Sequence, residues 1–245
     1  MTVSVCIPIY NESDAVENCA EQLYKKMISL KEKCGFDFEI IFCDDGSTDD
    51  CRAKAEAFAR GADGVRVIGY DENRGKGRAV RYAVEHTAGD VVLFTDCDLA
   101  YGVDVIEDAV LNIADADILI GSRNLTKDGY DGYGAIRKFA SKTYIKMLSA
   151  IGGLGVTDSQ CGFKVFKGES AKKIFSLCEC DGFAFDYEII LIAKKLGMKI
   201  SEMPVSVRNH GQSAVHVISD SFSMIKDVFR IKKRVSRLDI PRGAA

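Results

Sequence analysis

The chain has 245 residues, 47% of them hydrophobic and 28% charged, and its 36 acidic and 33 basic residues give a formal net charge of −3. This is the composition of an ordinary globular protein with a buried core, and the negative charge argues against non-specific binding of nucleic acid by the whole chain. The longest apolar runs, Val3–Pro8 and Ile189–Ala193, fall far short of the roughly 18 residues of a membrane span, and we expect no secretory signal because no basic segment and apolar stretch open the chain.

The first half alternates short apolar runs, typical of buried strands, with amphipathic segments typical of helices. Strands are expected at Val3–Pro8, Phe38–Cys43, Val65–Gly69, Val91–Thr95 and Asp117–Ile120. Helices are expected at Ser13–Lys33, Asp49–Arg60, Gly75–Thr87 and Val103–Ile113. This alternation predicts an α/β fold with a parallel sheet that is buried on both faces. Ligands of such sheets bind beyond the carboxyl ends of the strands.

The second half is less regular, and we expect it to extend the same domain. A glycine-rich stretch, Gly152–Gly155, separates its first helix from the segments that follow. Helices are expected at Ala135–Ile151, Phe185–Leu196 and Val217–Arg237, and extended segments at Cys161–Phe166 and Lys199–Val207.

Nine cysteines are scattered through the chain, an odd number without a Cys-x-x-Cys pair. The three histidines do not stand at a spacing typical of zinc ligands. We therefore predict small buried residues at Cys178 and Cys180 rather than a metal site, and a reducing compartment for the protein.

Two acidic residues follow the second predicted strand, in the string Asp44-Asp45-Gly46-Ser47-Thr48-Asp49. Carboxylates at a strand end beside a glycine turn offer acceptors for the ribose or base of a nucleotide. An alternative needs no ligand, since Ser47 or Thr48 would cap the next helix by accepting a hydrogen bond from one of its first N–H groups.

A glycine-rich turn follows the third predicted strand, in the string Asn73-Arg74-Gly75-Lys76-Gly77-Arg78. Backbone N–H groups at a helix start, together with Lys and Arg side chains, form an anion site. The string is not a Walker loop, and it lacks the third glycine of the dinucleotide fingerprint. A plain glycine turn explains it equally well.

Asp96 and Asp98 come directly after the apolar run Val91–Phe94. Because alternate residues of an extended chain point to the same side, we expect the two carboxylates to converge. Their hard oxygens can hold Mg²⁺ or Mn²⁺ and leave coordination positions for a diphosphate. Unpaired carboxylates at a buried strand end would be costly without such a cation.

These strings and several others follow one another in a recognisable order. The segment Val5–Glu12 opens the series, and after the aspartate pair come Gly121-Ser122-Arg123, Asp158–Lys164, Gly182–Glu188 and Glu202-Met203-Pro204-Val205. Together they resemble glycosyltransferase family 2, which has the GT-A fold, over nearly the whole chain. Within that family the chain is most similar to the polyprenyl-phosphate branch, nearer to dolichyl-phosphate β-glucosyltransferases than to mannose synthases.

The resemblance implies a Rossmann-like, mostly parallel sheet flanked by helices, with a C-terminal extension on the side of the acceptor. It divides the chain into a glycosyltransferase domain over residues 1–215 and a basic amphipathic helix and tail over residues 216–245. Within the domain, residues 1–122 correspond to the nucleotide-sugar half and residues 123–215 to the acceptor half.

The resemblance also implies roles for individual residues. The nucleotide-binding set is Pro8, Tyr10, Glu12, Asp44, Asp45, Lys76 and Asp96, and the metal ligands are Asp96 and Asp98. The candidates for gripping the acceptor phosphate are Arg123, Arg137, Arg208 and Ser213, and those lining the sugar and acceptor cleft are Asp158 and Gln160. Asp186 is expected to act as a base or to orient the acceptor; alternatively, Asp186 and Glu188 are only dipole partners at a helix start.

The sequence departs from the family pattern at two positions. Cys97 stands between the two aspartates, where a small residue such as Ala is usual, and its side chain is expected to point away from the metal. Ala214 stands where the family commonly has a lysine directly after Ser213, so the acceptor phosphate loses one cation. Arg208, His210 and His216 are the candidates to replace it.

The function implied is metal-dependent, inverting transfer of a hexose, glucose from UDP-glucose, to a polyprenyl phosphate. Two enzyme alternatives stay open: GDP-mannose as the donor, or a polysaccharide hydroxyl as the acceptor. A non-catalytic nucleotide-sugar-binding protein is an alternative from another class, supported by Ala214. A dinucleotide-dependent dehydrogenase is disfavoured because no complete Gly-x-Gly-x-x-Gly follows the first strand.

The C-terminal segment from Met224 to Ala245 contains seven basic and two acidic residues. Its apolar and basic residues interleave at roughly helical spacing, a pattern that suits an anionic bilayer surface, where each cation contributes about 1 kcal/mol. A solvated helix face is the alternative. Since a polyprenyl phosphate is membrane-bound, we expect a cytoplasmic protein, peripheral at the cytoplasmic face of the membrane, and the sequence is compatible with a homo-oligomer.

Overall fold

The computed structural model describes residues 1–131, 134–208 and 219–239. Its strands are β1 (Thr2–Ile9), β2 (Asp37–Asp45), β3 (Val65–Tyr70), β4 (Val91–Phe94), β5 (Ile118–Ser122), β6 (Lys164–Lys167) and β7 (Ile200–Pro204). Its helices are α1 (Val16–Cys34), α2 (Cys51–Ala59), α3 (Lys76–Glu85), α4 (Val105–Asn112), α5 (Ala135–Gly152), α6 (Gly168–Phe175), α7 (Phe185–Lys195) and α8 (Ser219–Arg237), with one 3₁₀ turn, η1 (Ile113–Asp115).

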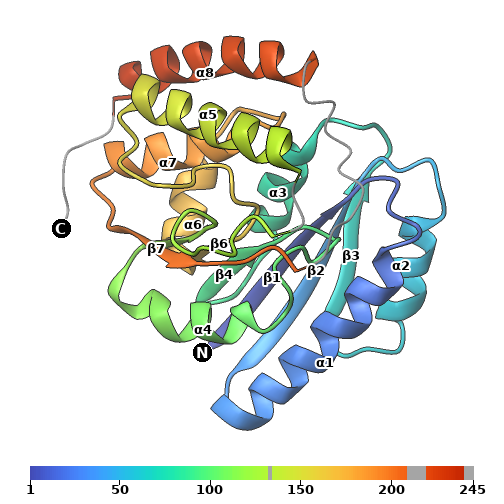
Figure 1. The fold of residues 1–245 in the computed structure, drawn as a ribbon. Coiled ribbons are helices and arrows are strands. Elements are labelled where there is room, and N and C mark those ends of the chain that lie inside the picture. The colour runs from blue at the N-terminus through green and yellow to red at the C-terminus, as the bar shows by residue number, and fades with distance from the viewer. Residues whose placement is uncertain (132–133, 209–218, 240–245) are drawn as a thin grey trace.

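The strands form a single sheet in the order β3-β2-β1-β4-β6-β5-β7 (Figure 1). β1 pairs in parallel with β2 and β4, β2 with β3, and β5 with β7. β6 runs antiparallel to both of its neighbours, β4 and β5. The sheet is therefore mostly parallel, as the alternation of strands and helices predicts, and the second half of the chain continues it through β6.

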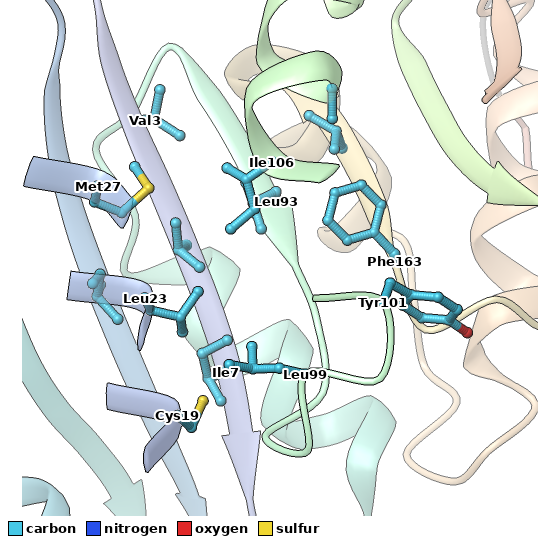
Figure 2. Close-up of a cluster of buried hydrophobic side chains, with 14 of the residues drawn as sticks. Val3, Ile7, Cys19, Leu23, Met27, Leu93, Leu99, Tyr101, Ile106 and Phe163 are labelled. Atoms are coloured by element: carbon cyan, nitrogen blue, oxygen red, sulfur yellow. The ribbon is translucent and has the colours of Figure 1, made fainter. Parts of the chain in front are cut away.

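Helices cover both faces of this sheet. Val3, Val5 and Ile7 of β1 point to one face, where they pack in a cluster with residues of α1, α2 and α4. Figure 2 shows Leu23 and Met27 of α1 in this cluster beside β1. The opposite face carries a second cluster, built with α3, α5, α6, α7 and α8. Because both faces are buried, β1 is a nearly continuous apolar run.

The expected elements lie within three residues of the observed ones, and one observed helix was not expected. The strand expected from Cys161 begins only at Lys164, because residues 161–163 form the approach to β6. Helix α6 was not expected; it starts directly after β6, so no loop signal separates it from the strand. Residues 217 and 218 of the expected last helix lie outside the described residues.

All nine cysteines are free thiols, and eight of them, Cys178 and Cys180 included, are buried as predicted. Within residues 1–131, 134–208 and 219–239, no helix combines the length and the hydropathy that crossing a membrane requires.

Candidate active site

The predicted site residues cluster where β1, β2 and β4 end at the same edge of the sheet. β2 lies on one side of β1 and β4 on the other, so the strand order reverses between β1 and β4. Open α/β sheets bind ligands at such a reversal, beyond the carboxyl ends of the strands. Glu12 follows β1, Asp44 and Asp45 end β2, and Asp96 follows β4, so all four stand at this position.

Asn11 ties the loop after β1 to the loop after β2. Its side-chain Oδ1 accepts hydrogen bonds from the backbone N–H groups of Thr48 at 2.8 Å and Asp49 at 3.3 Å, and its own N–H donates to Ser47 Oγ at 3.0 Å. Asn11 has a φ of 54°, a left-handed conformation that asparagine tolerates better than most residues. The loop that presents Tyr10 and Glu12 is therefore fixed before any ligand binds.

Neither Ser47 nor Thr48 caps α2, so the helix-capping alternative named the wrong residues. The carboxylate of Asp49 accepts the N–H of Cys51, the first residue of α2, at 3.0 Å. Thr48 uses its hydroxyl to donate to Asn11 at 3.2 Å, and the Ser47 hydroxyl accepts from Asn11 and from the Cys51 thiol. An acidic side chain suits this position because of the positive end of the helix dipole.

The carboxylate of Asp45 is already hydrogen-bonded to neighbouring groups of the protein. Its carboxylate accepts hydrogen bonds from the Tyr70 hydroxyl at 2.6 Å and the Asn73 side chain at 2.9 Å. It also accepts the backbone N–H groups of Arg74 at 2.9 Å and Gly75 at 2.9 Å. The glycine-rich turn before α3 does hold an anion, but that anion is the side chain of Asp45.

Gly75 is required at this turn by its surroundings. Its φ is 104°, and a Cβ there would lie 2.5 Å from the carbonyl oxygen of Asp181. Asp44 is also buried, but from the described residues it accepts only the Ser47 N–H at 3.3 Å, and it lies 3.7 Å from the Arg52 guanidinium. Of the two acids, Asp44 therefore keeps acceptor capacity for a ligand. Of the two other residues predicted to bind the nucleotide from β1 and its loop, Pro8 is half-buried and Tyr10 is 44% exposed.

Asp96 and Asp98 follow β4 and are not part of the strand. β4 ends at Phe94, and a turn follows in which the N–H of Leu99 donates to the Asp96 carbonyl at 3.0 Å. Leu99 takes a left-handed φ of 47°, and its side chain is buried in the core beneath the turn (Figure 2). The expected extended backbone is therefore wrong, because Asp96 and Asp98 belong to a turn, and the convergence of their carboxylates stays a prediction.

Opposite charges gather around this turn. The Lys76 ammonium lies 2.5 Å from Asp96 Oδ1. Burial lowers the pKa of Lys76, but Asp96 and Asp186 raise the pKa by more, so it lies above the ordinary value. Burial raises the pKa of Glu12, and the carboxylates of Asp98 and Asp96 raise it further. The negative charge of this region is thus only partly compensated by the protein.

A buried ion pair, Lys164 with Asp186, lies beside this group. Lys164 is fully buried at the start of β6, where its ammonium donates to Asp186 Oδ1 and to the Cys161 carbonyl at 2.7 Å. Burial raises the pKa of Asp186, and this outweighs the lowering by Lys164 and Lys76. Sequence reasoning missed Lys164, because a single Lys in a strand is usually solvated. Its place in the motif Asp158–Lys164 is the signal that pointed to it.

The oxygen donors of Asp96 and Asp98 and the acidity around them fit a divalent cation. Four acidic side chains, those of Glu12, Asp96, Asp98 and Asp186, lie in a region to which Lys76 and Lys164 bring two ammonium groups, so acidic groups outnumber basic ones. Among the described residues, Asp96 Oδ1 accepts no hydrogen bond of regular geometry. Carboxylate oxygens are the ligands that Mg²⁺ and Mn²⁺ prefer. The described residues hold no cluster of three or more metal-ligating side chains, so substrate oxygens would complete the coordination.

Arg123 and Asp158, which are expected on the acceptor side, form a buried two-pronged pair. Nε and Nη2 of Arg123 donate to Asp158 at 2.7 Å and 2.9 Å, and the Arg123 N–H donates to the same carboxylate at 3.1 Å. The guanidinium carbon lies 5.2 Å from the centre of the Tyr130 ring. The remaining guanidinium N–H groups are the ones that can meet a phosphate. Arg123 and Asp158, predicted as separate contacts, are thus one unit.

Residues 158–164 connect the two halves of the site. Asp158 pairs with Arg123, Gly162 packs against Asp96 and Lys164 pairs with Asp186. A Cβ at Gly162 would lie 2.5 Å from Asp96 Oδ2, so only glycine leaves this carboxylate its place. Gln160 stands between them, and its buried Nε2 donates to no group among the described residues.

The other predicted acceptor residues are placed differently. Arg208 is exposed and pairs with Asp104 at 3.4 Å, while its N–H donates to the Ala100 carbonyl at 2.7 Å beside the Asp98 turn. Arg137 lies in the first turn of α5, and its side chain is outside the described part. Ser213, Ala214, His210 and His216 lie outside the described residues.

Glu188, the neighbour of Asp186 in the first turn of α7, has a structural role. One carboxylate oxygen accepts the N–H groups of Glu179 at 3.0 Å and Cys180 at 2.8 Å, and the other accepts from Arg234 of α8 at 2.6 Å. Glu188 therefore fixes the loop before α7 and ties α8 to it. This role is larger than that of a dipole partner at a helix start.

The sequence of this chain is similar to those of known proteins. The family model described as Glycosyl transferase family 2 matches residues 4–175. A dolichyl-phosphate beta-glucosyltransferase of Saccharomyces cerevisiae is 31% identical over 249 residues, covering 94% of this chain and 74% of that protein. The dolichyl-phosphate beta-glucosyltransferase of Mus musculus is 31% identical, covering 95% of this chain and 75% of that protein.

Solved structures share the fold. Glucosyl-3-phosphoglycerate synthase from Mycobacterium tuberculosis, in complex with Mn²⁺, UDP and glucosyl-3-phosphoglycerate, matches with a TM-score of 0.68 at 22% identity, covering 97% of this chain and 81% of that one. Mannosyl-3-phosphoglycerate synthase from Rubrobacter xylanophilus matches with a TM-score of 0.67 at 22% identity, covering 100% and 78%. These matches confirm the GT-A fold expected from the sequence.

Proposed function

The chain belongs to glycosyltransferase family 2 and is a glycosyltransferase, and from this premise we propose that it transfers glucose from UDP-glucose to a polyprenyl phosphate with inversion at the anomeric carbon. The observation that carries the proposal is the similarity to dolichyl-phosphate beta-glucosyltransferases over 94% to 95% of the chain. These relatives are named for both the sugar and the lipid phosphate. UDP together with Mn²⁺ is bound by a protein of the same fold.

The donor binds at the ends of β1, β2 and β4 in this proposal. Asp44 accepts a hydrogen bond from the nucleoside, and the exposed ring of Tyr10 covers it. Asp45 does not contact the donor but supports the site indirectly, because it fixes the turn from which Lys76 projects. The ammonium of Lys76 then lies next to the diphosphate, where its positive charge stabilises the negative charge of the leaving group.

Asp96 and Asp98 would hold the divalent cation, Mg²⁺ or Mn²⁺, with Glu12 close by. When bound, the cation would neutralise the negative charge that develops on the leaving diphosphate. Gly162 keeps Asp96 in place for this task, since any larger residue would displace its carboxylate.

The acceptor phosphate attacks the anomeric carbon from the face opposite the leaving group, so a carbon–oxygen bond forms as the bond to the diphosphate breaks. A phosphate monoester has a second pKa of about 6 and is largely ionised near neutral pH. It needs positioning more than deprotonation, and the free N–H groups of Arg123 supply charge-assisted hydrogen bonds for that purpose. Asp186 orients Lys164 and Lys76 in this scheme, since one of its oxygens is already paired with Lys164.

The same proposal covers the domain organisation and location. Residues 1–215 would form the catalytic unit, and the basic helix α8 would bring it to the membrane that contains the polyprenyl phosphate, at the cytoplasmic face. Arg137 and Ser213 remain proposed phosphate contacts, and Gln160 a proposed contact in the sugar cleft.

The test is a transfer assay with purified protein, Mn²⁺, radiolabelled UDP-glucose and a short-chain polyprenyl phosphate. Label in the lipid phosphate supports the proposal. Label from GDP-mannose instead, or transfer only to a glycan hydroxyl, would establish one of the two enzyme alternatives. Binding of UDP-glucose without any turnover would indicate the non-catalytic alternative.

A matched pair of variants tests the metal assignment. Asp98→Asn should abolish transfer and the Mn²⁺-dependent part of UDP binding together. Asp115→Asn removes the same charge at an exposed position of η1 and should change neither. Normal turnover in Asp98→Asn would show that the metal is held elsewhere.

A further inference from the structure

Helices α5 and α8 form one surface of the molecule. They lie alongside one another at one end of the fold, on the far side from α1 (Figure 1). Val228, Ile231 and Val235 bury the inner face of α8 in the same cluster that contains Leu148 of α5. The Lys232 ammonium donates to the Ile151 carbonyl at the end of α5 at 2.5 Å. The two helices are therefore held together, and their outer faces point to solvent.

The outer face of α8 is basic and carries one aromatic ring. Its exposed residues recur at helical spacing: Lys226, Phe229, Arg230, Lys233 and Arg237. The Phe229 side chain is 56% exposed, although nothing in the fold requires a large apolar group there. Arg230 pairs with Asp227 at 2.9 Å, whereas Lys226, Lys233 and Arg237 form no ion pair within the described residues.

The outer face of α5 repeats this composition. Phe139, Lys142, Thr143 and Lys146 are exposed at the same spacing, and Phe139 is the most exposed large apolar side chain of the described residues, at 74%. The helix contains four basic residues and no acidic one. Neither Lys142 nor Lys146 forms an ion pair within the described residues.

Charge is strongly segregated as a result. α5 and α8 together contain ten basic and two acidic residues, a net charge of +8. Since the whole chain carries −3, the other residues carry −11. An acidic body with a basic two-helix end has a preferred orientation toward a negatively charged surface.

We propose that the outer faces of α5 and α8 together form the surface with which the protein docks on an anionic lipid bilayer. Amphipathic helices with Lys and Arg around Phe bind in the headgroup region, because the cations meet anionic lipid and the ring enters the acyl boundary. Two exposed phenylalanines stand among cations most of which form no ion pair with the described residues, and this composition matches that chemistry. The inference deepens the proposed function, which requires access to a membrane-bound acceptor, and extends it from α8 alone to α5.

The docking surface is continuous with the acceptor side of the site. Lys138 and Lys142 of α5 lie 5.8 Å and 5.2 Å from the centre of the Tyr130 ring, on which Arg123 also stands. A phosphate headgroup held under α5 is therefore close to the Arg123–Asp158 pair. Docking through both helices presents this edge of the site to the bilayer.

The test is flotation of the full chain with vesicles of 30% phosphatidylglycerol in phosphatidylcholine, against vesicles of phosphatidylcholine alone. Binding to the anionic vesicles, weakened by salt, is expected. Lys146→Glu in α5 and Lys233→Glu in α8 should each lower the vesicle partition coefficient at least fivefold, the change that corresponds to about 1 kcal/mol per cation lost. Phe139→Ser and Phe229→Ser should lower it as well.

Lys25→Glu is the matched control, since Lys25 is an exposed lysine of α1 at the other end of the molecule, and it should float like the unaltered protein. Equal binding to neutral vesicles, or a Lys146→Glu variant that floats normally, would overturn the proposal. Transfer to a water-soluble short-chain isoprenyl phosphate separates the two proposals. If Lys146→Glu loses flotation but keeps that transfer, the docking proposal is supported independently of catalysis. If the unaltered protein transfers but does not float, only the docking proposal fails; if it floats without transfer, only the proposed function fails.

Discussion

The ammonium group of Lys76 lies 2.5 Å from Oδ1 of Asp96, so a carboxylate expected to hold a metal ion is paired with a cation of the protein itself. Burial lowers the pKa of Lys76, but the carboxylates of Asp96 and Asp186 raise it by more, so Lys76 keeps its positive charge beside Asp96. Lys76 therefore competes with a divalent ion for Asp96 when no nucleotide is bound. A diphosphate entering the site offers Lys76 another partner.

Lys76→Met should consequently bind Mn²⁺ more tightly than the unaltered protein in the absence of nucleotide, by about three- to tenfold, because a competing charge is removed. The same variant should bind UDP in the presence of Mn²⁺ more weakly. Electron paramagnetic resonance of free Mn²⁺ measures the first effect and calorimetry the second. Lys25→Met serves as the control, and an unchanged or weaker affinity for Mn²⁺ alone would contradict the competition.

Gly162→Ala tests the position of Asp96 without changing any charge. The added Cβ would lie 2.5 Å from Asp96 Oδ2, so the carboxylate must move and Mn²⁺-dependent UDP binding should fall at least tenfold. Gly182→Ala makes the same substitution where nothing lies within 4 Å of the new Cβ. Its UDP affinity should match that of the unaltered protein. Equal affinities for both variants would show that Asp96 has room to move.

The sheet could be predicted from the sequence because hydrophobic patterning determines which segments form its strands. β1 is buried on both faces, so its apolar run and the polar loop after it are visible without a structure. The same reasoning misses α6, since a strand that passes directly into a helix leaves no loop between them. Boundaries of elements depend on such local geometry more than on composition.

The sequence predicts which candidate residues come to the same edge of the sheet, but not how they pair. Asp96, Asp98 and Lys76 are found from strand ends, yet Lys76–Asp96, Arg123–Asp158 and Lys164–Asp186 join residues 20 to 35 positions apart, which no local pattern encodes. The division of labour between Asp44 and Asp45 is also absent from the sequence, where the two acids are adjacent and equivalent. Only the strand pleat and the neighbouring turn distinguish them.

That division gives a further prediction. Asp45→Asn should lower the free energy of unfolding by about 2 kcal/mol, because its carboxylate accepts hydrogen bonds from four residues of the chain and charged acceptors make the stronger bonds. Asp44→Asn should cost less stability and lower the affinity for UDP about tenfold. Urea unfolding and UDP titration, both run on both variants, measure the contrast. The reverse result would exchange the roles of the two residues.

The Arg123–Asp158 pair is almost completely buried, so its two halves should depend on each other. Asp158→Leu alone leaves a buried guanidinium without a counter-charge and should destabilise the protein by about 3 to 5 kcal/mol, whereas Arg123→Met combined with Asp158→Leu should recover a large part of that loss. Thermal or urea unfolding of the single and double variants gives the coupling free energy.

The conservative variant Arg123→Lys tests the role of Arg123 in acceptor binding separately from its contribution to stability. Lys keeps the charge near Asp158 but has no planar fork, so it cannot serve the carboxylate and a phosphate at once. The KM for the lipid phosphate should rise at least tenfold while the affinity for UDP stays the same, because the pair lies on the acceptor side of residues 158–164. A variant whose UDP affinity falls while its acceptor KM is unchanged would move Arg123 to the donor side of the site.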